Sequence, residues 1–572
     1  MNPISIGKTL MKKWFFLSPS YCIVFLLSWF GLGATPFPIA PFFNLPLILV
    51  LVRTKPLGVN LLPLFFTIAI GSGLAYHEPT SPFGNYFDDL KVLIMVGCVI
   101  STFTLSPMIM YRAILNYTNI KEPIRNVWYH SWLLFPLLWT ATSSLIRRYS
   151  PLGSWGDWAY SIYNWGYTGD PLMQMASIGG LSLINLFLAL FAQLISDYMI
   201  YSYKIKRMNN ESLLDSETTS LLNNPNNRIK KLLEYNWYLM FAFGILFMAW
   251  IVGGSYRLQQ IENNNEPLKT MSIGCILPAP DTSIEDLLKS SDTLATNHNS
   301  KIVLWSESAI IIRNQKEFND MMDKAKLKTK EKKFFLGLTY KIMKKNMLTL
   351  IGPNGDIIFD YQKVHPVPLV ESYYIEGGQN DPPVKNITTP KTKRDHDTVS
   401  INVSGAICLD MDFPELLGKA AKAYLVLSPA QTWSNHIGLH HLRMASVRAI
   451  ENGYWILRCD GGGASGLIDP LGRIRHLEIS PNTKNSQLFS WDIPIKEQKV
   501  KTIYAEWGEW SVWGTLIILS MLRLVWIAAW EQSPHQMKDM WDGGVKKIQN
   551  GQRWAEQKYN EIFEYQRINE LL

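Results

Sequence analysis

The sequence has few charged residues and few cysteines for its length. Asp, Glu, Lys and Arg make up 18% of its 572 residues, below the roughly 25% of a typical soluble protein. The five cysteines, Cys22, Cys98, Cys275, Cys408 and Cys459, are odd in number and show no paired spacing, so neither a disulfide framework nor a zinc site is indicated. Apolar residues reach 47%. Much of the chain is therefore expected to face something other than water.

Long apolar runs fill the first half of the chain and recur once near its end. Most approach the roughly 20 residues that an α-helix needs to cross the hydrocarbon core of a bilayer. The second and third are shorter or interrupted by Pro. The first is interpreted as an uncleaved anchor, because further runs follow it directly. The sequence therefore predicts about eight transmembrane helices, over residues 14–32, 37–52, 57–76, 92–111, 127–146, 173–195, 237–253 and 510–529.

Lys and Arg are distributed unevenly between the segments that join these runs. Most fall in alternate segments, beginning with Lys8, Lys12 and Lys13 before the first run, which places those segments in the cytosol by the positive-inside rule. Seven spans then carry the chain to the non-cytosolic face and the eighth returns it. The net charge of +8 is thus explained by membrane orientation, and nucleic acid is not an expected partner.

The expected organisation has four parts. A membrane domain with seven helices covers 1–262, and a non-cytosolic α/β domain covers 263–502. A last transmembrane helix lies within 503–535, followed by a charged cytosolic tail over 536–572. The α/β assignment rests on short β-rich runs such as "KIVLWSES" and "AYLVLSPA", which alternate with helical stretches such as "GLHHLRMASVRAIENG". "PNGD" between two apolar runs predicts a hairpin.

Three chemically active residues each close a β-rich run of this domain: Glu307 in "VLWSES", Lys363 in "FDYQKVHPVP" and Cys408 in "GAICLD". Taken singly, a buried cysteine most often packs a core and a lone Glu or Lys is most often a surface charge. Together they suit acyl chemistry. A carboxylate can take the thiol proton, and a lysine can stabilise the oxyanion of a tetrahedral intermediate.

The order Glu, Lys, Cys resembles the nitrilase (carbon-nitrogen hydrolase) superfamily. More specifically, the chain resembles its membrane-embedded branch, the apolipoprotein N-acyltransferase family. "IVLWSESAI", "YQKVHPVPLVES" and "HHLRMASVRAIENG" are similar to the family's catalytic segments, and "GDPLMQMASIGGLSLINLFLALFAQLI" is similar to its sixth span. The resemblance implies a nitrilase-like αββα sandwich beside a polytopic helical membrane domain.

The resemblance also implies a two-step acyl transfer. Cys408 would attack an ester of a phospholipid, forming a thioester, and a lipoprotein or other amine would then take the acyl chain. Glu307 would act as base and then acid, while Lys363 and the backbone N–H near Leu409 would hold the oxyanion. Glu371 would support Lys363 or the nucleophile. No metal or organic cofactor is implied, and the partners are the phospholipid donor, the amine acceptor and membrane lipids.

The chain departs from the family beside the nucleophile. Leu409-Asp410 stands where the family usually has Tyr-Glu, which leaves the acceptor open. A membrane-tethered amidase or hydrolase using the same triad is the alternative, and a non-catalytic lipid-binding protein is a weaker one. The α/β domain would be periplasmic in a bacterium. An "ETTSLL" stretch resembling a sorting signal and a glycosylation sequon at Asn386 keep a eukaryotic lumenal or extracellular location open.

Several other residues have two interpretations. Trp433, His441 and Arg523 are candidate contacts to substrate or lipid; equally, Trp433 and His441 could pack in the core, and Arg523 could snorkel or pair between helices. Cys275 and Cys459 are expected to be core residues rather than redox-active.

Overall fold

The computed structural model describes residues 19–33, 35–77, 86–120, 133–163, 170–212, 225–263, 269–391, 398–480, 485–496, 498–518 and 521. The chain divides into two compact units, Met1–Ser511 and Val512–Leu572. The helices up to Asn263, both sheets and the helix over Ile503–Trp507 belong to the first unit. Arg523 and the predicted cytosolic tail lie outside the described residues.

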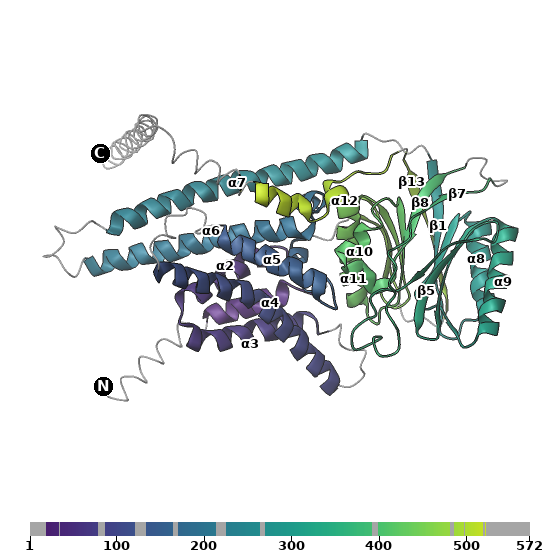
Figure 1. Cartoon of the computed structure of the whole chain (residues 1–572), viewed down its shortest axis with the longest axis horizontal. Helices are drawn as coiled ribbons and strands as arrows, with labels where there is room; N and C mark the ends of the chain where they lie inside the picture. The colour runs from purple at the N-terminus through teal and green to yellow at the C-terminus, as the bar shows by residue number, and fades with distance from the viewer. Residues whose placement is uncertain are drawn as a thin grey trace, which may run out of the picture. The chain divides into compact units, whose positions relative to one another are not determined.

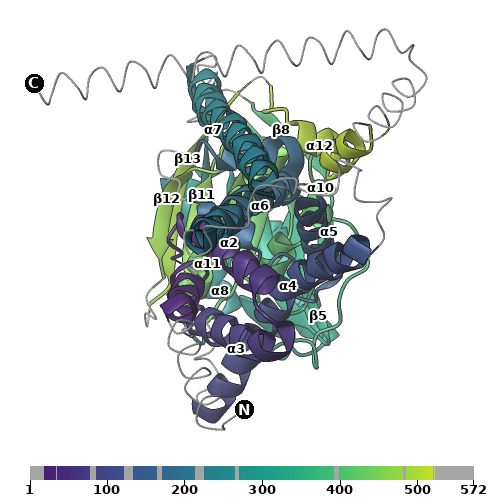
Figure 2. The same cartoon turned by 90° about the vertical axis from the view of Figure 1, so that its left-hand side faces the viewer.

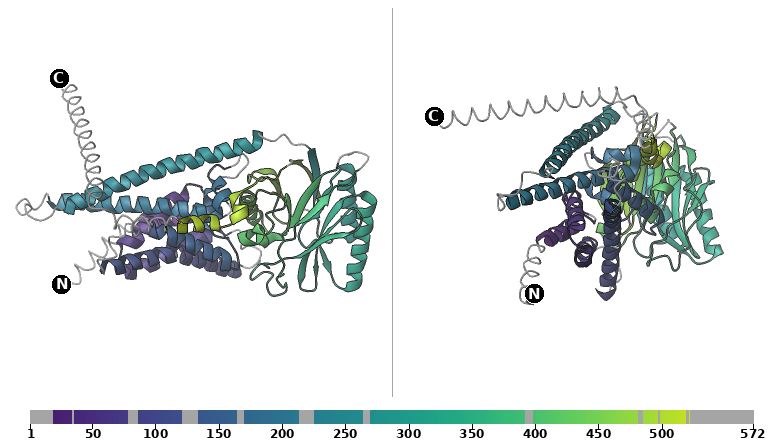
Figure 3. Two further views of the ribbon diagram at one scale, coloured as in Figure 1. Left: turned by 45° about the horizontal axis from the view of Figure 1, so that its top comes forward. Right: turned by 60° about the vertical axis from the view of Figure 1, so that its left-hand side comes forward.

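The first part of the chain is helical, and its helices lie on one side of the strands that follow (Figure 1, Figure 3) and in front of them in Figure 2. An apolar helix over Pro19–Phe30 comes first. Helix α3 packs on α4, and both α2 and α5 pack on α6. The helices are α2 (Ala40–Thr54), α3 (Leu57–Ala75), α4 (Tyr86–Ile120), α5 (Leu134–Tyr149), α6 (Ala176–Ser212) and α7 (Pro225–Asn263).

Three of the described helical segments are long and apolar enough to cross a membrane: Leu57–Ala75, Leu90–Asn116 and Met173–Tyr203. Apolar side chains such as Val59 and Leu62 are exposed by 62% and 64%, and outward-facing apolar surface of this kind suits contact with lipid. The length and composition of these helices indicate a membrane protein. The expected number of about eight spans is not confirmed, and the predicted eighth run is described only as a helix from 510 to 518.

Two boundaries differ from the sequence-based expectation. Helix α6 continues past the predicted run 173–195 to Ser212, and α7 begins at Pro225, well before the predicted run 237–253. Helix α4 likewise extends beyond the apolar run 92–111 at both ends. Hydropathy marks the part of a helix that contacts lipid, whereas the backbone hydrogen bonds continue into the polar flanks.

Two mixed sheets form the α/β domain. The first has the order β13-β1-β2-β4-β5-β6, with β3 paired to β4, and the second has the order β12-β11-β10-β9-β8-β7. The first-sheet strands are β1 (Lys269–Leu277), β2 (Ile302–Trp305), β3 (Ile310–Ile312), β4 (Phe335–Ile342), β5 (Lys345–Ile351), β6 (Ile357–Gln362) and β13 (Gln487–Ile495). The second-sheet strands are β7 (Lys385–Thr388), β8 (Ser400–Gly405), β9 (Leu425–Ala430), β10 (Trp455–Asp460), β11 (Ala464–Ile468) and β12 (Ile474–Ile479).

Helices cover the outer faces of both sheets (Figure 1). Helices α8 (Ile284–Asn297) and α9 (Gln315–Lys332) lie on the first sheet, and α10 (Pro414–Gly418) and α11 (Asn435–Asn452) lie on the second. One apolar core fills the space between the sheets, built from residues of β1, β2, β8, β9 and β10 among others. This four-layer α-β-β-α arrangement is the one expected. The predicted hairpin is also present, since β5 and β6 pair antiparallel around Gly355, whose φ is +82°.

The first and last strands of the domain are neighbours. Strand β1 pairs antiparallel with β13 from Lys269↔Ile495 to Leu277↔Gln487. A short helix, α12 (Ile503–Trp507), follows β13.

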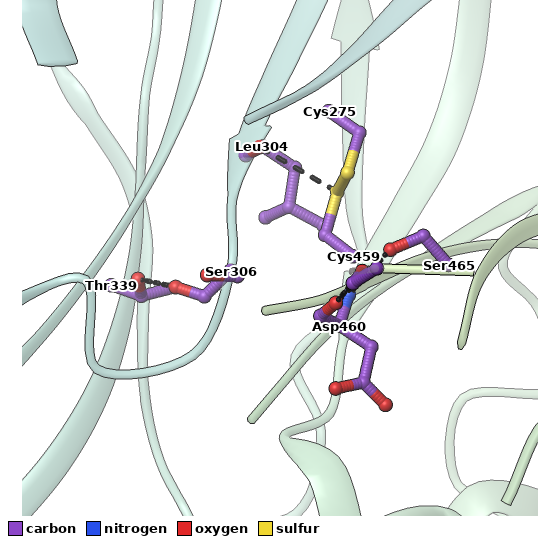
Figure 4. The surroundings of a disulfide bond; sticks show 8 residues. Cys275, Leu304, Ser306, Thr339, Cys459, Asp460 and Ser465 are labelled. Atoms are coloured by element: carbon purple, nitrogen blue, oxygen red, sulfur yellow. Dashed lines mark hydrogen bonds between the residues drawn. A yellow bond between two sulfur atoms is a disulfide. The ribbon is translucent and has the colours of Figure 1, made fainter. Parts of the chain in front are cut away.

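A disulfide bond joins the two sheets (Figure 4). It connects Cys275 of β1 to Cys459 of β10, which are 184 residues apart in the sequence and fully buried. Both are core residues, as expected, but the inference that the spacing indicates no disulfide was wrong for this pair. Cys408 is a free, buried cysteine.

Candidate active site

The ends of three strands bring the candidate catalytic residues together. Glu307 follows β2, Lys363 follows β6, and Cys408 opens a 3₁₀ turn, η6 (Cys408–Asp412), after β8. The Nζ atom of Lys363 lies 2.8 Å from Oε1 of Glu307, and all three side chains are buried. The strand ends therefore gather these three residues at one place.

The backbone fixes each of these positions. The Glu307 N–H donates to the carbonyl of Ala430 at the end of β9, which ties the first sheet to the second. The Lys363 N–H donates to the carbonyl of Asn346, and its own carbonyl accepts from the Gly378 N–H. Cys408 has a φ of +49°, a left-handed conformation that a non-glycine residue adopts only where its surroundings hold it.

Lys363 is a buried cation between two carboxylates. Besides Glu307, it contacts Oε2 of Glu371 at 2.5 Å. Burial alone would lower the pKa of Lys363, but the negative charges around it, that of Glu307 first, raise this pKa well above its usual value. Burial opposes ionisation of Glu371, yet Lys363 holds the pKa of that carboxyl below its usual range. The lysine is therefore an ammonium at neutral pH, which suits stabilisation of an oxyanion.

Cys408 rests as a neutral thiol. Burial, followed by repulsion from Glu307, raises its pKa well above the usual value, and the attraction of Lys363 only partly offsets this. A thiol must lose its proton to attack a carbonyl. The site consequently needs a base that acts during the attack, and Glu307 is the carboxylate whose charge acts most strongly on this sulfur.

Glu307 is oriented by two residues that the sequence does not reveal. Its Oε1 also accepts from Nδ2 of Asn346 at 2.7 Å, and its Oε2 accepts from the backbone N–H of Gln431 at 2.8 Å. Asn346 is fully buried on β5. No local pattern distinguishes it, because the contact depends on where the sheet places β5, which β4 separates from β2.

Asp410 ties the nucleophile turn to the lysine segment. Its fully buried carboxylate accepts hydrogen bonds from the hydroxyl of Tyr361 at 2.8 Å, the backbone N–H of His365 at 2.9 Å and the backbone N–H of Ile407 at 3.2 Å. Tyr361 and His365 flank Lys363 on either side. Asp410 therefore fixes the position of η6 relative to Lys363, a structural task that its place in the sequence did not reveal.

The remaining predicted residues are placed less directly. Leu409 is buried within η6, and Trp433 is half-buried between β9 and α11. His441 is buried, with Nδ1 3.2 Å from Oδ1 of Asp412 at the end of the nucleophile turn. In the part of the chain that the structure describes, no cluster of three or more His, Cys, Asp or Glu side chains is suited to hold a metal ion.

A polar cavity of about 690 Å³ reaches Glu307 from the carboxyl ends of several strands. Gln431 and Gly461 border it on the second sheet, and Ser308 and Arg313 border it on the first. Water or a polar reactant in this cavity would therefore have access to the carboxylate.

The comparison with protein families assigns the class of this domain. The family profile described as "Carbon-nitrogen hydrolase" matches residues 288–488, a segment that contains Glu307, Lys363 and Cys408. An amidase from Nesterenkonia sp. has a solved structure that is 19% identical, covers 39% of this chain and 90% of its own, and gives a TM-score of 0.33. By the family match, the α/β domain belongs to the carbon-nitrogen hydrolase, or nitrilase, class.

Curated relatives indicate which branch of this class the chain resembles. The Apolipoprotein N-acyltransferase of Pseudomonas putida is 36% identical over 124 residues, which is 21% of this chain and 23% of that protein. "Hydrolase in agr operon" of Staphylococcus lugdunensis is 28% identical over 170 residues, 28% of this chain and 67% of that protein. The chain thus spans about a quarter of the length of the curated acyltransferase. These matches confirm the resemblance of the chain to the apolipoprotein N-acyltransferases within the nitrilase superfamily.

Proposed function

We propose that the protein is an acyltransferase that moves an acyl chain from a phospholipid, through a thioester on Cys408, to the amino group of a lipoprotein or another amine. One observation carries the proposal. A free, buried thiol shares a site with a buried Glu307–Lys363–Glu371 cluster that can supply both a base and a fixed positive charge.

In the first half-reaction, Sγ of Cys408 attacks the ester carbonyl while Glu307 takes the thiol proton. Lys363 and the backbone N–H of Leu409 stabilise the oxyanion. The intermediate collapses by breaking the ester C–O bond. Glu307 returns the proton to the leaving oxygen, so the products are the thioester and a lysophospholipid.

In the second half-reaction, a neutral amine attacks the thioester carbonyl and gives its proton to Glu307. The C–S bond breaks, and the departing sulfur takes up that proton. The products are an N-acyl amine and the free enzyme. The names of the acyltransferase relatives support a lipoprotein as acceptor, while Leu409-Asp410 beside the nucleophile leaves the amine open.

The proposed topology has about eight transmembrane helices, seven within 1–262 and one within 503–535. The catalytic domain over 263–502 is non-cytosolic, and both 1–13 and 536–572 are cytosolic. Three long apolar helices and the basic residues of the connecting segments support this arrangement. A disulfide between Cys275 and Cys459 also suits an oxidising, non-cytosolic compartment.

A membrane-tethered amidase or other hydrolase is the second candidate, with water in place of the amine. The polar cavity that reaches Glu307 favours this alternative, because water there would have access to the base that would activate it.

The first experiment incubates the purified protein in detergent with phospholipids and records its intact mass, with Cys408→Ala as control. The expected result is a mass gain of one acyl chain that hydroxylamine reverses and the variant lacks. Addition of amine acceptors then separates the candidates, because a transferase yields an N-acyl product and a hydrolase yields the free acid. Folded wild-type protein that gains no acyl chain from any phospholipid class would refute the phospholipid donor.

A further inference from the structure

A loop from the helical part of the chain contacts the end of the nucleophile turn. Residues 150–158 follow α5, and Ser154 lies within them. Its backbone N–H and its hydroxyl both donate to the carbonyl of Asp412, at 2.8 Å and 2.7 Å. Asp412 is the last residue of η6, the turn that Cys408 opens. Residues 258 positions apart in the sequence thus share two buried hydrogen bonds.

Gly153 makes this close approach possible. It has a φ of +57°, and a Cβ atom there would lie 2.4 Å from the Asp412 carbonyl oxygen. That distance is shorter than any real contact of a Cβ atom allows, so a larger residue would push the loop and the turn apart. Glycine also adopts the left-handed conformation without steric cost.

The same loop is anchored to the helices that carry it. The carboxylate of Asp157 accepts from Nη1 of Arg147 on α5 at 2.7 Å and from Nδ2 of Asn185 on α6 at 2.8 Å. The Ser154 hydroxyl also lies 2.8 Å from the hydroxyl of Tyr160. These hydrogen bonds fix the loop to α5 and α6.

The nucleophile turn needs support because Cys408 holds a left-handed backbone conformation, with φ +49°. Strained conformations of this kind persist only where several contacts fix the chain on both sides. Asp410 fixes the beginning of the turn from within the α/β domain. Ser154 fixes its end from the helical part.

We propose that Gly153 and Ser154 are positioning residues for the nucleophile, and that the helical part of the chain thereby holds Cys408 in its reactive geometry. The proposal rests on the proposed function in taking Cys408 as the nucleophile. It goes further in assigning the loop after α5 a role in catalysis, besides any role in the membrane.

The test compares Gly153→Ala with Gly156→Ala in the full-length protein in detergent. Gly156 lies in the same loop with a φ of +80°, but a Cβ there would meet only Ile100, at 3.3 Å. Both variants carry the backbone cost of a left-handed alanine, and only the first displaces Asp412. The rate of acyl-enzyme formation at saturating phospholipid should fall about 100-fold in Gly153→Ala, since a displacement near 1 Å costs about that much. It should stay close to wild type in Gly156→Ala, with the phospholipid KM unchanged in both.

A second pair covers the case in which Gly153→Ala fails to fold. Ser154→Ala and Tyr160→Phe both remove the bond between these two hydroxyls, but only Ser154→Ala removes a bond to Asp412. The rate in Ser154→Ala should be about 2- to 10-fold below that of Tyr160→Phe, the usual effect of one hydrogen bond. Equal rates within this pair, in protein with an unchanged melting temperature, would overturn the proposal.

The test of the positioning role can be separated from the test of the phospholipid donor. If wild-type protein forms no acyl-enzyme, the phospholipid-donor hypothesis fails, and the rate of Cys408 alkylation by iodoacetamide, read on the Cys408 peptide, replaces the acyl-enzyme assay. A changed alkylation rate in Gly153→Ala or Ser154→Ala, relative to the matched control, then supports the positioning role. An unchanged rate refutes it.

Discussion

At the scale of single residues, the site depends on how Glu307 is held. Its Oε1 receives two donors, Lys363 and Asn346, and its Oε2 receives the backbone of Gln431. The carboxylate is therefore fixed in one orientation, with little freedom to rotate away from the sulfur.

Asn346→Ala should slow acyl-enzyme formation by about 10- to 100-fold, because a hydrogen bond to a charged group contributes about 1.5–3 kcal/mol. Ser308→Ala is the matched control. Its hydroxyl contacts Oδ1 of Asn346 at 3.4 Å and makes no hydrogen bond to Glu307. Single-turnover kinetics by intact mass would measure both rates, and a rate for Asn346→Ala equal to that of the control would contradict the orienting role.

Asp410→Asn should impair the site more than its small change in shape suggests. The carboxylate accepts hydrogen bonds from Tyr361, His365 and Ile407. In an amide, the NH₂ group is itself a donor and would face at least one of these donors. A buried polar group left unsatisfied costs about 1–3 kcal/mol, and the rate of Cys408 acylation should fall about tenfold or more. Tyr361→Phe, which removes a single donor, should cost less, and the reverse ranking in single-turnover rates would count against this role for Asp410.

The sequence predicts the site residues that stand at strand ends. It misses the site residues that lie within strands. Glu307, Lys363 and Cys408 are recognisable because each closes a β-rich run, and such ends converge in a layered α/β domain. Asn346 and Tyr361 lie within strands, where the alternating pattern is the same for a packing residue as for an orienting one. Their roles depend on which strands become neighbours, and this is set by the fold as a whole.

At the scale of elements, α6 contains a break that the sequence hints at only by "GG". Gly179 has a φ of −132° and Gly180 a φ of +60°. A Cβ at Gly180 would lie 2.4 Å from the ring of Tyr504 on α12. The break therefore lets the aromatic ring pack directly against the helix backbone.

Gly180→Ala should lower stability by about 1–3 kcal/mol, the usual cost of a strained backbone conformation, in addition to the displacement of Tyr504. Gly179→Ala is the matched control, because its backbone conformation is accessible to alanine. Thermal unfolding of the two variants in the same detergent would measure the difference. Equal melting temperatures would show that the close contact with Tyr504 is dispensable.

Helices and turns of the α/β domain were predicted well, since their signals are local. The helix predicted from "GLHHLRMASVRAIENG" is α11, with Ser434 as its N-cap, and the "PNGD" hairpin joins β5 to β6. The order of strands in the two sheets was beyond the sequence, because the pairing of β1 with β13 joins residues more than 200 positions apart. The pairing of Cys275 with Cys459 was missed for the same reason.

At the scale of the whole molecule, the free energy of unfolding depends on the titration of a lysine, Lys499, between β13 and α12. Burial lowers the pKa of Lys499 to about 8 from an ordinary value of 10.5. Between these two pH values the unfolded chain binds a proton that the folded protein does not, so this lysine makes folding more favourable as pH rises through the window.

Lys499→Met should remove that dependence. The substitution also changes the free energy of unfolding by an amount that does not depend on pH. Relative to that constant, the variant should be more stable than wild type below pH 8. This advantage should shrink by up to about 3 kcal/mol as the pH approaches 10.5. Lys501→Met, at an exposed position nearby, is the control and should follow the wild-type profile. Thermal unfolding from pH 7 to 10.5 measures all three proteins. Parallel profiles for wild type and Lys499→Met would contradict the burial of this amine.

The pairing of β1 with β13 has a consequence for how such a protein could arise. The α/β domain starts at Lys269 and closes at Ile495, and these two residues are opposite each other in adjacent strands. A domain whose two ends leave side by side can be inserted into a short connection between two helices without separating them. A single insertion of a gene for a nitrilase-class enzyme into a gene for a helical membrane protein would thus give a chain of this order, with both original folds intact.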